Sequence, residues 1–64
     1  MVNLTKIKEL RKEHKVTGNA LAEMLDIKRV SYFHKESGMR GFKVEELCVL
    51  AKLYNIKVDD LLIY

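Results

Sequence analysis

TGNALAEMLDIKRVSYFHKES, residues 17–37, decides the fold, because it has the pattern of two short helices joined by a tight turn. Thr17 is a favourable N-cap for the first helix. That helix carries an apolar stripe formed by Leu21, Ala22 and Leu25. Asp26 interrupts the stripe, Ile27 restarts it, and Gly38 is a favourable C-cap for the second helix. The spacing therefore predicts a helix, a two-residue turn and a second, basic helix.

The residues before this stretch predict another helix. Leu4, Ile7 and Leu10 recur at three-residue steps, while lysines and an arginine occupy the other faces. Asn3 or Thr5 can cap its first turn. We therefore expect the first helix to pack one apolar face against the rest of the domain.

After the central stretch, residues 44–54 form the clearest amphipathic pattern. Its apolar stripe consists of Val44, Leu47, Leu50, Ala51 and Tyr54. Asn55 suits the end of this helix, and residues 58–63 predict a last short helix. Because no segment alternates as a strand does, we predict an all-α, compact five-helix fold with residues 1–64 as a single domain.

Composition restricts what can stabilise so short a chain. Its one cysteine, Cys48, excludes an intrachain disulfide and is expected to be a small buried apolar residue. His14, His34 and Cys48 do not match the spacing of metal ligands, so we expect no metal and no cofactor. No apolar run approaches the roughly 18 residues of a membrane span, and no signal peptide is evident. These features predict a soluble protein of the cytoplasm.

Charge is distributed unevenly along the chain. Residues 1–43 contain ten lysines and arginines against five acidic residues, whereas residues 44–64 contain two against four. A basic half often occurs by chance in a small protein. The asymmetry nevertheless favours a polyanion as the partner of the N-terminal part.

An ordered series of motifs over residues 7–62 resembles the Cro and phage-repressor (Xre-like) family. The motifs are IKELRKEHKVT, LAEMLDI, the ESG of residues 36–38 and VEELCVLAKLYNIKVDDLL. The resemblance implies a lambda-repressor-like DNA-binding domain with its helix-turn-helix at about residues 17–37. It also implies that helix 28–37 enters the major groove of double-stranded DNA, and that two copies bind a palindromic operator as a homodimer. The expected location is therefore the cytoplasm, in association with the nucleoid.

The resemblance further implies roles for individual residues. The positions expected to face DNA bases are Lys28, Arg29, Val30, Phe33 and His34. The positions expected to face phosphates are Thr17, Gly18, Asn19, Ser37, Arg40 and Lys43. Arg11 and Glu36 match a structural ion pair between the first and third helices. Apolar residues at the end of the chain, Ile63 and Tyr64, would suit a dimer contact.

Several positions depart from the family pattern. Gly18 replaces a glutamine that anchors the second helix in family members, and Asp26 replaces the glycine of the turn. Lys28 and Lys43 replace the usual Ser or Thr caps, which weakens each helix start by about 1 kcal/mol. An apolar residue is also expected where Lys35 stands. These departures raise the question of what compensates for them.

The adjacent aromatic residues of the third helix cannot both face the core, because neighbours on a helix point about 100° apart. We expect Tyr32 to point inward and Phe33 to point outward, where its ring can touch a thymine methyl group. The alternative is that Phe33 is half-buried and covers the site left open by Lys35. For Arg29, bidentate contact with guanine is weighed against contact with a phosphate.

Two functions remain open from the sequence. The first is a sequence-specific DNA-binding transcriptional regulator of the repressor or Cro type. The second is a helix-turn-helix fold used as a protein-interaction module, an antirepressor or antitoxin-like partner of another regulatory protein, for which an exposed Phe33 would be a suitable anchor. We expect no enzyme and no small-molecule substrate, because the chain has no nucleophile–base pair and hardly room for a pocket.

Overall fold

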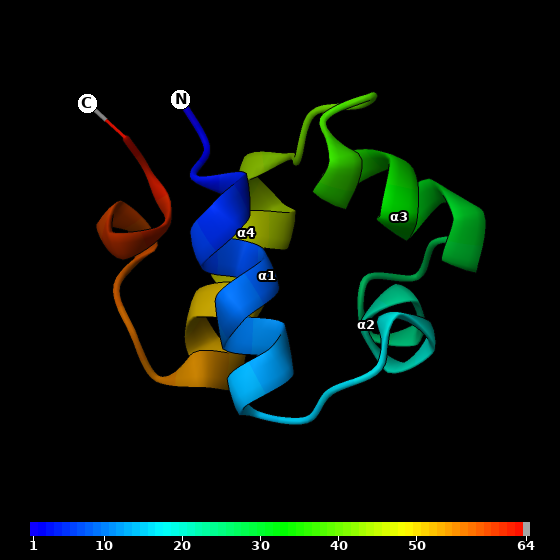
Figure 1. Cartoon of the computed structure of the whole chain (residues 1–64), viewed down its shortest axis with the longest axis horizontal. Helices are drawn as coiled ribbons and strands as arrows, with labels where there is room; N and C mark the ends of the chain where they lie inside the picture. The colour runs from blue at the N-terminus through cyan, green and yellow to red at the C-terminus, as the bar shows by residue number, and fades with distance from the viewer. Residues whose placement is uncertain (64) are drawn as a thin grey trace.

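The computed structural model describes residues 1–63 as four α-helices followed by one 3₁₀ helix. They are α1 (Leu4–Glu13), α2 (Gly18–Met24), α3 (Arg29–Ser37), α4 (Val44–Tyr54) and η1 (Val58–Leu61) (Figure 1). The prediction of an all-α domain is confirmed, although the fifth helix is only one 3₁₀ turn. Within the described part of the chain, no helix is long and apolar enough to cross a membrane.

Local capping fixes where the helices begin and end. The side chain of Asn3 accepts a hydrogen bond from the N–H of Lys6, and that of Thr17 accepts one from the N–H of Ala20, each at 3.1 Å. Gly38 and Asn55 end their helices in the left-handed conformation, with φ of 90° and 56°. These interactions are local, and the sequence predicted them.

Two turns depend on residues that tolerate positive φ. Asp26, between α2 and α3, has φ 57°, so the turn forms without the glycine of the family pattern. Lys15, between α1 and α2, has φ 54°. The chain turns at Lys15 between α1 and α2, and the end of α1 and the start of α2 line one depression.

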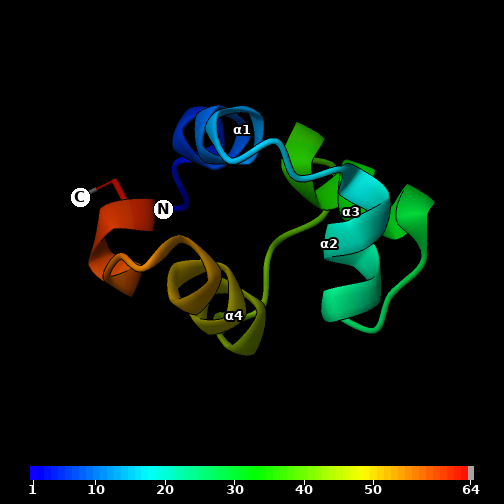
Figure 2. The same ribbon diagram turned by 90° about the horizontal axis from the view of Figure 1, so that it is seen from below.

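The core lies between all five helical elements. Its fully packed side chains are Ile7, Leu10, Leu21, Ala22, Tyr32, Leu47, Leu50, Ala51, Tyr54 and Leu61. Figure 2 shows α1 and α4 on opposite sides of the molecule, with α2 and α3 together at one end and η1 at the other. This arrangement leaves the outer face of α3 uncovered.

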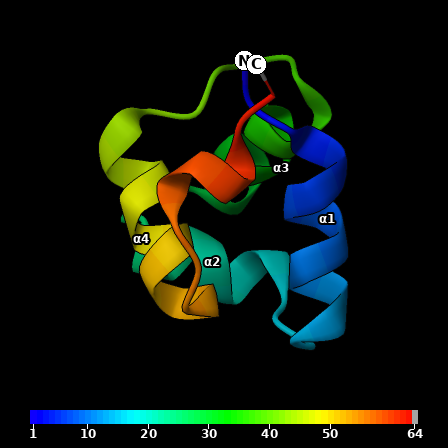
Figure 3. The same cartoon turned by 90° about the vertical axis from the view of Figure 1, so that its left-hand side faces the viewer.

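The beginning of the chain lies beside the last described residues, 61–63 (Figure 3). The N–H of Asn3 donates to the carbonyl of Leu61 at 2.8 Å, and the N–H of Ile63 donates to the carbonyl of Met1 at 2.7 Å. Val2 and Leu62 form an isolated antiparallel bridge between these hydrogen bonds. Backbone pairing therefore closes the domain at the end opposite α2.

Two expectations for α4 are wrong. Val44 is 68% exposed, although it was placed in the apolar stripe, and Cys48 is exposed rather than buried. Residues four apart share one side of a helix, and Val44 and Cys48 both lie on the outer side of α4. The inner position in the first turn is taken by Glu46, which is 7% exposed.

Glu46 is buried because it pairs with Lys35 of α3. The ammonium of Lys35 donates to both carboxylate oxygens of Glu46, at 2.7 and 2.9 Å. Glu46 also accepts the backbone N–H of Lys43 at 2.7 Å, which satisfies one donor at a helix start that has no side-chain cap. Burial alone would raise the pKa of Glu46, but these hydrogen bonds lower it below its ordinary value. Glu46 of α4 thus provides the counter-charge that allows Lys35 to occupy an apolar position.

We expect Lys35→Met to lower the free energy of unfolding by about 3 kcal/mol at neutral pH, because the buried carboxylate of Glu46 would lose its cation. Lys35→Met combined with Glu46→Gln should recover most of that loss. In the double variant the amide oxygen can still accept the N–H of Lys43. Urea unfolding of the three proteins measures both effects, and similar instability of the single and double variants would contradict them.

The same pair predicts a pH dependence of stability. Because the pKa of Glu46 is lowered by folding, its contribution is complete above the ordinary glutamate pKa of about 4.3 and is lost as the pH falls through the lower folded value. Between roughly pH 5 and 3, the wild type should therefore lose more stability than the Lys35→Met, Glu46→Gln variant. Glu45→Gln, at an exposed position of the same helix, should keep the wild-type loss. Equal losses in the wild type and the double variant would show that the pair does not cause this dependence.

Candidate nucleic-acid interface

The outer face of α3 begins with three consecutive exposed residues. Lys28 is the N-cap of the helix, and Arg29 and Val30 form its first turn, with Val30 56% exposed. His34, one turn later, is half-buried. Tyr32 lies on the inner side with no exposed surface, as the sequence predicted. A basic and partly apolar surface therefore faces away from the core at the start of α3.

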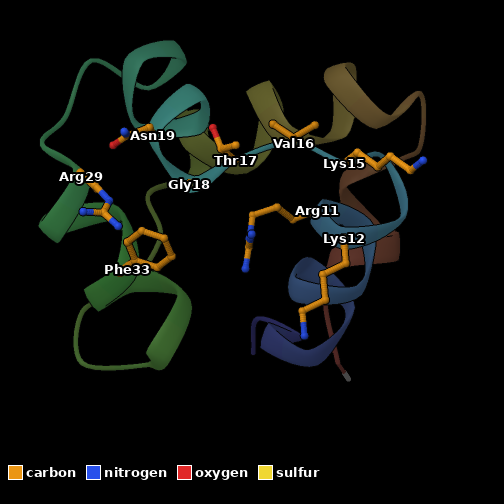
Figure 4. A pocket seen from close by; sticks show the side chains of 9 residues that line it. All are labelled: Arg11, Lys12, Lys15, Val16, Thr17, Gly18, Asn19, Arg29 and Phe33. Carbon is orange, nitrogen blue, oxygen red and sulfur yellow. The ribbon is translucent and has the colours of Figure 1, made fainter.

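This surface continues into a depression between the end of α1, the start of α2 and α3. Its lining residues are Arg11, Lys12, Lys15, Val16, Thr17, Gly18, Asn19, Arg29 and Phe33 (Figure 4). Six of them belong to the residues assigned from the sequence. Four of the nine are arginines or lysines, so the depression is suited to an anion.

Three lining residues had no predicted contact with DNA: Lys12, Lys15 and Val16. Lys12 and Lys15 are exposed, and the left-handed turn at Lys15 places them beside the start of α2. A basic run that ends two residues before the cap Thr17 was the available signal. The family pattern assigns phosphate contacts to other positions, so this run was not among the predicted residues.

Thr17 and its neighbours offer hydrogen-bond donors to this depression. The Thr17 hydroxyl oxygen accepts the N–H of Ala20, and its proton remains available for another acceptor. Thr17 and Asn19 are exposed, whereas Gly18 between them is buried. The first N–H groups of a helix have no acceptor within the helix, so this corner can hold a phosphate oxygen.

Phe33 covers Gly18, which corrects the expectation that its ring points outward. A β-carbon at position 18 would lie 2.2 Å from the ring Cζ atom, so the ring occupies the space of a side chain at that position. Phe33 is half-buried and packs against the core. The weighed alternative of a half-buried ring was closer, but the site that Phe33 fills is at Gly18 and not at Lys35.

One lining residue, Arg11, belongs to a hydrogen-bonded group of three side chains that joins α1 to α3. Arg11 donates to both carboxylate oxygens of Glu36, from Nε at 2.9 Å and from Nη2 at 3.1 Å. The hydroxyl of Tyr32 donates to the same carboxylate at 2.5 Å. The hydrogen bond to Glu36 raises the pKa of Arg11, and burial together with that carboxylate raises the pKa of Tyr32. Both donors therefore keep their protons at neutral pH, and α3 is fixed relative to α1.

The remaining assigned residues lie elsewhere. The Ser37 hydroxyl donates to the carbonyl of His34 within α3 at 3.0 Å, and Lys43 is exposed at the start of α4. Arg40 lines a second, mainly apolar depression beside the N-terminus. Ile63 is 48% exposed next to Met1, and Tyr64 lies outside the described residues. Among residues 1–63 no group of histidine, cysteine and acidic side chains could hold a metal ion.

Comparisons with known proteins agree with this geometry. A family model described as helix-turn-helix matches residues 7–61. The chain is 37% identical over 57 residues to the uncharacterized HTH-type transcriptional regulator YobD of Bacillus subtilis (strain 168), an alignment that covers 89% of this chain and 51% of the relative. It is 36% identical over 61 residues to the HTH-type transcriptional regulator AnsR of the same organism, covering 95% and 53%. The chain thus spans about half the length of these curated relatives. No solved structure matches it significantly.

The contact between Gly18 and Phe33 predicts that the effect of Gly18→Ala on the free energy of unfolding depends on whether the ring of Phe33 is present. Gly18→Ala should destabilise the wild type by about 1–3 kcal/mol, because the new methyl group would collide with the ring. In a Phe33→Ala background, the same substitution should be neutral or stabilise by up to about 1 kcal/mol, since alanine is the better helix former. Thermal or urea unfolding measures the difference.

Gly41→Ala is the matched control for this cycle. Among the described residues, none apart from Gly41 and its two chain neighbours comes within 4 Å of a β-carbon built at Gly41, so that substitution should have a similar small effect in both backgrounds. If Gly18→Ala also had the same effect with and without the ring of Phe33, the contact with the ring would not be the reason that position 18 requires glycine.

Proposed function

Because this chain belongs to the Xre-like helix-turn-helix family, we propose that it is a sequence-specific DNA-binding transcriptional regulator that places α3 in the major groove. The observation that carries this proposal is the continuity of the exposed start of α3 with the basic depression at the start of α2. B-DNA presents base edges in a groove about 12 Å wide and phosphates along its rim. One surface can therefore meet both.

Within this proposal, some residues at the start of α3 contact bases and others contact phosphates. Arg29 donates two hydrogen bonds to a guanine edge, and Val30 contacts a thymine methyl group. His34 lies deeper and contacts the same groove only at its margin. Lys28, a flexible point charge at the N-cap, meets a phosphate. Phe33 contributes through the packing of its ring and not as an outward anchor.

Phosphate contacts in the proposal come from both sides of the groove. Thr17 and Asn19 meet the backbone at the start of α2, with Gly18 offering only its N–H, and Lys12 and Lys15 add charge there. Ser37, the last residue of α3, and Arg40 and Lys43, which follow the helix, approach the opposite strand. Contacts to phosphates supply most of the affinity and orient the helix, whereas base contacts supply specificity.

A second copy completes the proposed mode of binding. A single small module gives limited specificity, whereas a two-fold dimer reads two half-sites about 34 Å apart. Ile63 is the described apolar residue at the chain end that suits such a contact, being 48% exposed. Binding of this kind occludes polymerase, so repression is the expected effect in a bacterial cytoplasm. Dimer and operator are parts of the proposal.

The alternative of a protein-interaction module has lost its main support. It rested on an outward aromatic ring and on unexplained residues at two positions. Phe33 packs on Gly18, and Lys35 pairs with Glu46, so each unusual residue has a partner inside the domain. Exposed Val30 is a smaller anchor than the ring would have been.

Selection of DNA from a random pool tests the proposal most directly. We expect a palindromic motif with half-sites about one helical turn apart. Affinity for that motif should fall roughly 10,000-fold between about 50 and 200 mM salt if each subunit of the dimer neutralises about four phosphates, about eight in all. Enrichment of no common motif, or an affinity independent of salt, would count against DNA as the ligand.

Arg29→Ala and Lys28→Ala separate base contact from phosphate contact. Loss of Arg29 should weaken binding to the selected motif by about 1–3 kcal/mol and relax the preference at one base pair, because a bidentate contact is removed. Loss of Lys28 should weaken specific and random DNA by similar factors and reduce the salt dependence. Fluorescence anisotropy on both kinds of DNA distinguishes the two. Equal losses on both DNAs for Arg29→Ala would remove its proposed role.

A further inference from the structure

The ring of Phe33 is closely packed between its neighbours. The tip of the ring lies against Gly18 at a distance that no other residue type allows, with ring carbons 2.2, 2.6 and 3.0 Å from where a β-carbon would be. On its inner side the ring meets the edge of Tyr32, with the centroids 5.5 Å apart and the planes at 77°. Tyr32 is itself fully buried and hydrogen-bonded to Glu36. The ring is therefore held between two buried residues, Gly18 and Tyr32.

Two guanidinium groups lie near this ring. The Cζ atom of Arg11 is 5.9 Å from the ring centroid, and that of Arg29 is 5.5 Å from it. Figure 4 shows the ring between the two arginine side chains. Both distances are within the range of a cation–π interaction.

The two arginines differ in the interactions that their side chains make besides the contact with the ring. Arg11 is fixed by two hydrogen bonds to Glu36. Arg29 is exposed, and its side chain makes no hydrogen bond or ion pair with any of residues 1–63. The ring of Phe33 is thus the contact that restricts the guanidinium of Arg29 in the free protein.

We propose that Phe33 is a positioning residue that orients Arg29 before DNA arrives, and that Gly18 is present because it admits the ring. An unrestrained arginine loses much rotamer freedom when it binds. A guanidinium already held over an aromatic face loses less, and its planar donors stay free for a base edge. The inference rests on the proposed function for its consequence in DNA binding, but the contact itself exists without DNA.

The aromatic face is what the proposal requires, not the volume of the side chain. Leucine can fill much of the space beside Gly18 but offers no π-system to a cation. Tyrosine keeps the face. Phe33→Leu and Phe33→Tyr therefore separate packing from orientation. Phe42→Leu is the matched control, because Phe42 also stacks edge-on against Tyr32, at 6.2 Å, and has no arginine over its ring.

Binding to the selected motif tests the consequence. Phe33→Leu should reduce discrimination at the base pair identified with Arg29→Ala by about two- to fivefold, the range of a single cation–π contact. Phe33→Tyr and Phe42→Leu should keep the wild-type discrimination. In an Arg29→Ala background, Phe33→Leu should have no further effect, because its action passes through Arg29. An equal reduction with and without Arg29 would overturn the proposal and assign the ring to packing or to direct contact with DNA.

Proton NMR of the free protein tests the contact independently of DNA. The side-chain protons of Arg29 should be shifted upfield by the ring in the wild type and in Phe33→Tyr, and should return to ordinary values in Phe33→Leu. Unshifted Arg29 protons in the wild type would overturn the proposal even if the protein binds DNA. Shifted protons in a wild type that prefers no DNA sequence would instead uphold the contact and refute the proposed function.

Discussion

The bidentate hydrogen bond between Arg11 and Glu36 is the constraint on which the candidate interface depends. A helix that offers its outer face to a ligand can be held only from its inner face. Glu36 ties α3 to α1 through Arg11, and the neighbouring Lys35 ties it to α4 through Glu46. Two consecutive residues thus bind the same helix in two directions. The orientation of α3 does not depend on its exposed side.

The sequence predicted those parts of the fold that depend on neighbours along the chain. The caps at Thr17 and Gly38 and the turn at Asp26 are local, and each follows from the residue type. The inner position of Tyr32 followed from helical spacing. Exposure of Cys48 was not predictable in this way, because it depends on which elements of distant sequence cover α4.

The candidate site was predictable in position but not in its packing. Six of the residues assigned from the family pattern line one depression: Arg11, Thr17, Gly18, Asn19, Arg29 and Phe33. The contact of Phe33 with Gly18 joins residues 15 apart, and each looks anomalous when it is considered alone. An unfavourable residue was explained only when its partner in space was known. A residue that departs from a family pattern is therefore better interpreted together with the residue that it contacts in the structure.

The bridge between Val2 and Leu62 has a consequence for how this domain can be connected to other chains. The first residues of the chain and the last described residues, 61–63, lie together at one edge of the molecule, away from the start of α2 (Figure 2). A reporter or a second domain fused ahead of Met1 would therefore lie away from the exposed start of α3. The adjacency also makes the described domain suited to circular permutation, with a short linker joining Ile63 to Met1 and new ends opened in a surface loop.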